Sequence, residues 1–195
     1  STNNSGDLVS LPISAVLFDV DGTIVDSAPV VMSTFREVLS DFGLPIPDDQ
    51  RLRSYVGPPL WHSFGELGYS GQLLADLVRG YRERYIRHHL DPEPFEGVPE
   101  LVWDLHRAGV PVATATSKQA PMALSQMEHL GLAGAFDVIA GATPDPSCSK
   151  ATVINEAVAR LGAQGADVSH PVIVGDSVWD VRGGHEAGIP VIGVG

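Results

Sequence analysis

Residues 15–27 read Ala15-Val-Leu-Phe-Asp-Val-Asp-Gly-Thr-Ile-Val-Asp-Ser27, so that four apolar residues lead directly into two aspartates one residue apart. The pattern predicts a buried strand that ends in a turn. Because open α/β sheets bind ligands beyond the carboxyl ends of their strands, we expect Asp19 and Asp21 to share that crevice. Two neighbouring carboxylates suit a Mg²⁺ site or a pair of acid and nucleophile. Taken alone, such a pair is more often an ordinary turn with capping aspartates.

The composition limits the classes of protein and partner. The chain has 195 residues, 44% of them hydrophobic and 18% charged, which suits one α/β domain with a modest insertion. Its 12 Lys and Arg against 24 Asp and Glu give a net charge of −12, which argues against nucleic acid polymers and lipid surfaces as partners. No stretch has the roughly 20 apolar residues of a membrane span. The polar start and the single cysteine, Cys148, lead us to expect a cytoplasmic protein.

The order of the predicted elements divides the chain into two units. After a leader of residues 1–12, helices are predicted at 29–42, 51–55, 61–67 and 73–90, and no strand interrupts them. A proline-rich segment, 91–99, follows. Strands are then predicted at 110–116, 136–140, 172–174 and 191–194, and helices at 99–107, 120–130, 150–161 and 178–187. This alternation predicts a doubly wound, Rossmann-like parallel sheet formed by residues 1–28 and 95–195, with residues 29–94 inserted as a helical cap domain.

Polar residues follow the later strands of the predicted sheet. Thr116 and Ser117 stand at the end of a predicted strand, just before a predicted helix. Hydroxyls and free N–H groups at the start of a helix can bind an anion. Lys150 begins another helix and is one of only two lysines in the chain. Asp176 ends a third strand, and Asp180 lies one helical turn further on. Each signal alone has an ordinary explanation, either helix capping or a surface lysine, but all of these strand ends face one crevice.

Four ordered motifs carry a resemblance to a known family: Phe18-Asp-Val-Asp-Gly-Thr-Ile-Val-Asp-Ser27, Thr116-Ser-Lys, Lys150 and Gly175-Asp-Ser-Val-Trp-Asp180. Together they resemble the haloacid dehalogenase superfamily, and within it the phosphoglycolate phosphatase-like branch. That branch has a cap between the first and second motifs, as here. Two departures are that Ala151 stands where many relatives have proline, and that the chain stops soon after the strand at Val191, so we expect a truncated C-terminus.

The resemblance implies a Mg²⁺-dependent phosphatase that hydrolyses a small-molecule phosphomonoester. Asp19 would be the nucleophile that forms an aspartyl phosphate, and Asp21 the general acid and base. The metal ligands would be Asp19, the backbone carbonyl of Asp21, and Asp176, with Asp180 orienting Asp176 and Lys150. The groups that bind the phosphoryl oxygens would be Gly22, Thr116, Ser117 and Lys150. Thr116 and Lys150 would count among the catalytic residues as well, because phosphoryl transfer needs groups that hold the phosphoryl oxygens.

The sequence also allows other reactions and substrates. A sugar phosphomutase shares Asp-x-Asp-Gly-Thr and is the main alternative, although it usually carries a cap histidine where Val30 to Met32 stand. A non-enzymatic binding protein on this fold is the second alternative. Phosphoglycolate, nucleotide and sugar monophosphates, and pyrophosphate all fit as substrates, and a monomer or weak dimer is expected.

Several other features carry weaker hypotheses. The basic segment 81–89 is expected to be a solvated helix face rather than a substrate patch. Arg51 or Arg53, with Tyr55 nearby, are the cap residues that would reach the crevice. Cys148 lacks the surroundings of a catalytic thiol, and the seven histidines show no spacing typical of a zinc site.

Overall fold

The computed structural model describes residues 12–175 and 178–193, and its centre is a parallel sheet. The sheet has five strands in the order β3-β2-β1-β4-β5, which are β1 (Ala15–Phe18), β2 (Val112–Gln119), β3 (Val138–Ala142), β4 (Pro171–Gly175) and β5 (Val191–Gly193). In the central strand β1, Phe18 pairs with Thr114 on one side and Val174 on the other. All four residues of β1 are buried, as an unbroken apolar run predicts. The predicted doubly wound sheet is confirmed.

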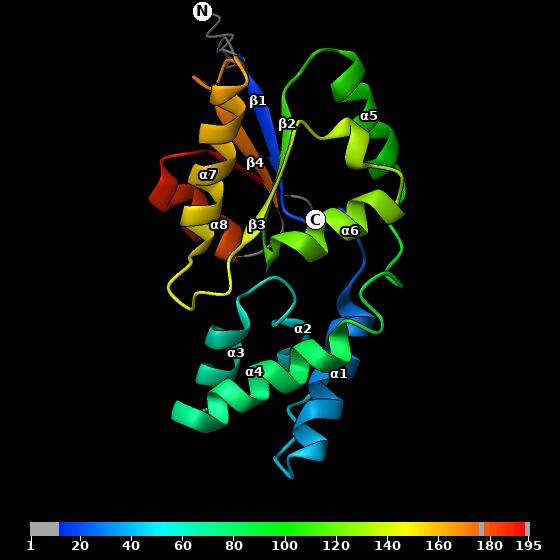
Figure 1. The fold of residues 1–195 in the computed structure, drawn as a ribbon, viewed down its shortest axis with the longest axis vertical. Helices are drawn as coiled ribbons and strands as arrows, with labels where there is room; N and C mark the ends of the chain where they lie inside the picture. Colours follow the sequence, from blue (N-terminus) through cyan, green and yellow to red (C-terminus); the bar gives the residue numbers. More distant parts are fainter. Residues whose placement is uncertain (1–11, 176–177, 194–195) are drawn as a thin grey trace, which may run out of the picture.

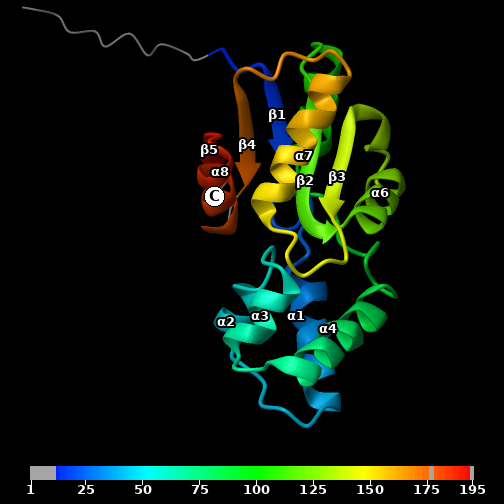
Figure 2. The same ribbon diagram turned by 60° about the vertical axis from the view of Figure 1, so that its left-hand side comes forward.

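Helices cover both faces of the sheet (Figures 1 and 2). They are α5 (Val98–Arg107), α6 (Ala120–His129), α7 (Lys150–Ala163) and α8 (Val178–Ala187), with a short 3-10 helix, η1 (Ala133–Ala135), before β3. The alternation of β1 side chains decides which face each residue joins. Leu17 belongs to the hydrophobic cluster that contains Ile154 of α7, whereas Phe18 belongs to the cluster that contains Met127 of α6. Both faces of the sheet are therefore buried around the end of β1.

A separate bundle of four helices lies below the carboxyl edge of the sheet in both ribbon views. Its helices are α1 (Ala28–Asp41), α2 (Asp49–Arg53), α3 (Leu60–Glu66) and α4 (Gly71–Tyr85). Phe35 is fully buried at its centre, with its ring 5.1 Å from that of Phe64 and 4.8 Å from that of Tyr81. Because this bundle has a hydrophobic core of its own, we propose that residues 29–94 form a cap domain.

Two chain segments connect the bundle with the sheet, and they lie side by side. Asp26 N–H donates to the Glu93 carbonyl at 2.9 Å, and Phe95 N–H donates to the Ile24 carbonyl at 2.9 Å. An antiparallel bridge joins Val25 to Pro94 between these bonds. The two crossings are thus held as one narrow connection.

The described helices are short; the longest, α4, has 15 residues. Among these described residues, none of the helices combines the length and hydropathy that crossing a bilayer requires.

Two elements end three or more residues away from the predicted positions. β2 continues beyond Thr116 to Gln119, because its pairing with β3 shifts register between these residues and the chain bulges there. α4 ends at Tyr85 rather than near Leu90. Residues 86–90 instead form turns, in which the Ile86 carbonyl accepts from the His89 ring at 2.9 Å and His88 N–H donates to the Tyr85 carbonyl at 3.0 Å.

Gly141 in β3 lies directly against the bulged end of β2. A Cβ at this position would stand 2.7 Å from the Ala120 Cα and 2.7 Å from the Lys118 carbonyl oxygen. Both neighbours are backbone atoms, which cannot turn aside as a side chain can. The missing side chain therefore allows the segment that carries Thr116 to Lys118 to pack against β3.

We predict that Gly141→Ala lowers the free energy of unfolding by about 1–3 kcal/mol, because the added methyl group forces a backbone shift. Gly65→Ala is the matched control, since nothing lies within 4 Å of its Cβ position in α3. That change should raise the stability by roughly 0.5–1 kcal/mol, as alanine is the better helix former. Urea unfolding followed by circular dichroism measures both, and equal stability of Gly141→Ala and wild type would contradict the prediction.

Candidate active site

Asp19 and Asp21 follow β1 through a tight turn. Gly22 adopts a φ of +81°, which glycine allows without strain. The Val20 carbonyl accepts hydrogen bonds from the N–H groups of residues 23–25, at 3.2, 2.9 and 3.1 Å. Asp19 and Asp21 are only 2% and 9% exposed. The turn therefore holds two buried carboxyl groups at the carboxyl end of the central strand.

Lys150 connects Asp19 to three other elements. Its Nζ donates to Asp19 Oδ1 at 2.9 Å and to the Ala115 carbonyl of β2 at 2.7 Å, and it lies 3.2 Å from Asp180 Oδ1 of α8. The Lys150 and Asp180 side chains are 4% and 0% exposed. Lys150 reaches this position because α7 begins at this residue, where the Ser149 hydroxyl accepts from Thr152 N–H at 3.1 Å as an N-cap.

Burial governs the protonation of this group of three side chains. It raises the pKa of Asp19 to about 8; Lys150 opposes the shift and Asp180 adds to it. Burial also lowers the pKa of Lys150, but the attraction of Asp19 and Asp180 outweighs it, so that this pKa is raised overall. Lys150 therefore remains an ammonium group between two carboxyl groups. Full ionisation of Asp19 near neutral pH would require more positive charge beside it.

Asp21 has a different cationic partner, Lys118. Lys118 Nζ lies 3.3 Å from Asp21 Oδ1 and donates to Gln126 Oε1 at 2.6 Å. It also lies 5.4 Å from the centre of the Tyr85 ring. Lys118 is not among the site residues that the sequence predicts. Its position directly after Thr116 and Ser117 in a chain with two lysines was the available signal.

The predicted phosphate-binding residues lie in the same region. Thr116 is buried, and its hydroxyl accepts from Lys118 N–H at 3.1 Å. Ser117 Oγ is a buried atom without a hydrogen-bond partner among the described residues. Gly22 N–H donates to the Val25 carbonyl at 2.9 Å, so that this donor is engaged within the turn. The phosphate-binding roles stay predictions.

Of the predicted metal ligands, Asp19 and Asp21 are described by the structure, whereas Asp176 lies outside the described residues. Among the residues that are described, no group of three or more His, Cys, Asp or Glu side chains has the arrangement of a metal site. Within this part of the chain, Asp19 accepts two hydrogen bonds, from Val20 N–H at 2.8 Å and from Lys150, and both end on Oδ1. The other carboxyl oxygen of Asp19, Oδ2, thus accepts a hydrogen bond from neither of these two donors.

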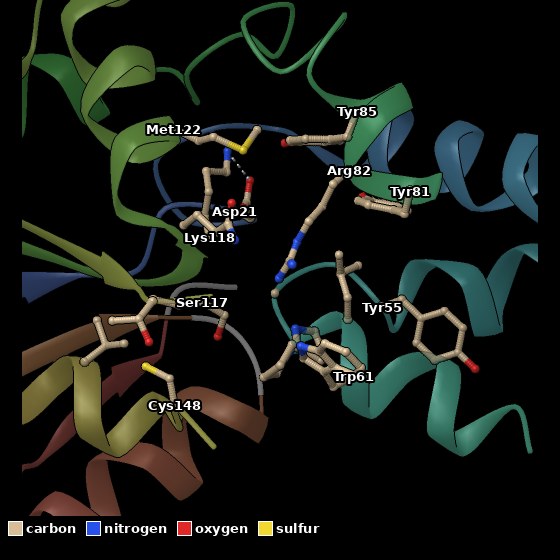
Figure 3. A pocket seen from close by; sticks show the side chains of 18 of the residues that line it. Asp21, Tyr55, Trp61, Tyr81, Arg82, Tyr85, Ser117, Lys118, Met122 and Cys148 are labelled. Atoms are coloured by element: carbon tan, nitrogen blue, oxygen red, sulfur yellow. Dashed lines mark ion pairs between the residues drawn. The ribbon is translucent and has the colours of Figure 1, made fainter. Parts of the chain in front are cut away.

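A cavity of about 850 Å³, its open mouth included, separates the sheet edge from the helical bundle (Figure 3). The core contributes Asp21, Ser117 and Lys118 to its lining. Aromatic and basic residues come from the bundle: Tyr55, Trp61, Tyr81, Arg82 and Tyr85. In Figure 3, Arg82 extends from α4 into this space, and Lys118 lies beside Asp21.

The predictions for the cap residues require correction. Tyr55 lines the cavity, but Arg51 and Arg53 are not among its lining residues. Arg51 instead donates to the Tyr55 hydroxyl at 3.0 Å, which directs it along the bundle. The segment 81–89 is not a uniformly solvated face, because Arg82 lines the cavity. Its partial burial lowers the pKa of Arg82.

We predict that the stability of the metal-free protein, measured relative to Asp19→Asn, falls as the pH rises from about 4 to about 8. The raised pKa means that folded Asp19 keeps a proton that the unfolded chain has released in this range. Asn cannot ionise, so the change with pH of the difference in unfolding free energy between the two proteins reports the proton that folded Asp19 keeps. Asp104→Asn is the control, because the Asp104 side chain is 70% exposed. Parallel curves for wild type and Asp19→Asn in EDTA would contradict the prediction.

The chain is similar to several known proteins. Tyrosine-protein kinase PtkA of Mycobacterium tuberculosis is 37% identical over 182 residues, which are 92% of this chain and 61% of that protein. The phosphoglycolate phosphatase of Caulobacter vibrioides is 30% identical over 184 residues, 91% of this chain and 77% of that protein. The chain thus spans about three fifths of the length of PtkA.

Solved structures and a family description agree with these relatives. A haloacid dehalogenase-like family protein, SP0104 from Streptococcus pneumoniae, superposes with a TM-score of 0.82 and 29% identity, covering 94% of this chain and 85% of that one. The family described as haloacid dehalogenase-like hydrolase matches residues 16–194. The family match includes the turn with Asp19 and Asp21, the Thr116 strand end and Lys150. The chain therefore belongs to the haloacid dehalogenase-like hydrolase family.

Proposed function

We propose that this chain is a phosphatase that hydrolyses small-molecule phosphomonoesters through an aspartyl-phosphate intermediate. One observation carries the proposal: Asp19 lies buried at the end of β1 with Lys150 bonded to Oδ1, while Asp21 lines the adjoining cavity. A nucleophile, a second carboxyl group and a cation thus lie at one strand end. The phosphatase names of several relatives support the same chemistry.

Asp19 would act as the nucleophile. Its carboxylate oxygen would attack phosphorus, forming an acyl phosphate while the bond from phosphorus to the leaving oxygen breaks. Lys150 would hold Asp19 in place and place positive charge near the phosphoryl oxygens. Thr116 and Ser117 would offer hydroxyl groups to the same oxygens, and the unpartnered Oγ of Ser117 supports that assignment.

Asp21 would move the protons. In the first step it would give a proton to the leaving alkoxide oxygen, and in the second it would take one from the water that attacks the acyl phosphate. Its place in the cavity lining supports this role, because the leaving group must lie on the solvent side of phosphorus. The products are the alcohol and inorganic phosphate, and Asp19 returns to its free form.

Mg²⁺ is the cofactor that we propose for this site. Asp19, the Asp21 backbone carbonyl and Asp176 would hold it, with Asp180 orienting Asp176 and Lys150. The ion would supply positive charge that lets an anionic carboxylate approach an anionic phosphate. Two observations support the fit: both hydrogen bonds to Asp19 from described residues end on Oδ1, and burial raises the pKa of Asp19, which a cation would lower.

The relative PtkA favours a second candidate function, phosphoryl transfer to a protein tyrosine. The supporting observation is the 37% identity with a protein named a tyrosine-protein kinase. Asp19 and Asp21 could act in phosphoryl transfer to water or to a tyrosine hydroxyl, so only measured turnover distinguishes a phosphatase from a kinase. A sugar phosphomutase would differ from both by releasing no net phosphate.

We also propose that the chain works in the cytoplasm, as a monomer or weak dimer. The net charge of −12 and the single cysteine support this proposal. The partner would be a small phosphate ester rather than a polymer.

We predict Mg²⁺-dependent phosphate release from a panel containing phosphoglycolate, nucleoside monophosphates, sugar phosphates, pyrophosphate and p-nitrophenyl phosphate. EDTA should abolish release and added Mg²⁺ should restore it. Asp19→Asn should lower kcat by more than about 1000-fold, because the nucleophile is lost. Asp21→Asn should lower kcat by about 100-fold or more, because proton transfer is lost.

Asp26→Asn serves as the matched control, since this exposed aspartate follows the same turn and should retain full activity. A parallel reaction with labelled ATP and tyrosine-containing protein tests the second candidate. Phosphate release that persists unchanged in Asp19→Asn, or label on tyrosine without any release from the panel, would contradict the phosphatase proposal.

A further inference from the structure

Lys118 is a buried cation with one hydrogen-bond acceptor and one ion-pair partner. Its side chain is 5% exposed, although it lies in the wall of the cavity. The ion-pair partner is Asp21, whose Oδ1 lies 3.3 Å from Nζ, and the acceptor is Gln126 Oε1, at 2.6 Å. The Tyr85 ring presents its face to the same ammonium, 5.4 Å away. The side chain is therefore held from three sides in one position.

Gln126 extends these contacts to the cap. It is fully buried in α6, and its Nε2 donates to the His89 carbonyl at 3.2 Å. His89 follows α4 in the turns that lead back to the core, and Tyr85 is the last residue of α4. A continuous series of contacts thus runs from the cap backbone through Gln126 and Lys118 to Asp21.

We propose that Lys118 is a positioning residue that places the carboxyl group of Asp21. Through Lys118, the position of this carboxyl group depends on whether the cap lies against the core. The inference rests on the proposed function, because it assigns Lys118 to the proton transfer by Asp21. The burial of Lys118 costs hydration, which only its fixed acceptors offset, so the ammonium keeps them in a set geometry.

The geometry explains why the cap matters for the chemistry. When the cap lies against the core, Gln126 and Tyr85 confine Lys118, and Lys118 confines Asp21. When the cap moves away, Lys118 loses its contact with the Tyr85 ring, and Gln126 loses the His89 carbonyl that fixes its amide group. The proton donor is then in place only when the cavity is closed over a substrate.

Leaving-group dependence tests the proposal. The alkoxide of an alkyl phosphate needs a proton as its bond to phosphorus breaks, whereas p-nitrophenolate leaves readily without one. Lys118→Met keeps the length of the side chain but removes the ammonium. We expect its kcat/KM for the best alkyl ester of the panel to fall roughly tenfold or more relative to its kcat/KM for p-nitrophenyl phosphate. A general loss of structure would lower both values alike.

Two further variants complete the experiment. Gln126→Met should shift the same ratio in the same direction by a smaller factor, and Glu128→Gln, an exposed change on the same helix, should leave it unchanged. Lys118→Arg should recover part of the ratio, because it restores the cation. If Lys118→Met does not fold, the ratio for Gln126→Met decides.

The outcomes separate this inference from the proposed function. If the wild type hydrolyses both esters and the ratio stays within twofold in the deciding variant, the inference is overturned and the phosphatase function stands. If the wild type hydrolyses neither ester, the proposed function fails, and the inference fails with it.

Discussion

A buried ammonium group needs acceptors on every side, and Lys150 finds them on three separate elements. Asp19 follows β1, the Ala115 carbonyl belongs to β2, and Asp180 belongs to α8. Removing any one of these would leave the Lys150 ammonium without one of its fixed acceptors, among side chains that are at most 4% exposed. The requirement ties α7 to both sides of the central strand and holds the Asp19 carboxyl group in a single orientation.

The same constraint explains the chemical character of the site. Two carboxyl groups face one ammonium, so burial leaves Asp19 with a raised pKa and a need for further positive charge. A nucleophile with this surrounding is ionised best when another cation is close. The arrangement therefore links the stability of the fold to the proposed chemistry, since the buried charges that the sheet tolerates are the charges that phosphoryl transfer uses.

The helical bundle completes the cavity at the sheet edge. Asp19 is enclosed by the core, but the cavity in front of Asp21 is completed by Arg82, Trp61 and Tyr85 from the helical bundle. The bundle has its own aromatic core around Phe35 and joins the sheet through one narrow connection. If the bundle moves as the proposed cap, this core would let it keep its internal packing while it admits and encloses a substrate.

The sequence alone determined the features that depend on local pattern. The apolar run 15–18 predicted the central strand, the alternation after residue 99 predicted the parallel sheet, and the strand ends identified Asp19, Asp21 and Lys150 as neighbours. Only the tertiary structure decided how Lys118 pairs with Asp21, where α4 ends, and that Arg82 lines the cavity. Those outcomes depend on contacts between residues distant in sequence, such as the contact of Gln126 with the His89 carbonyl. Such contacts produce no periodic pattern in the sequence, and they override local propensity.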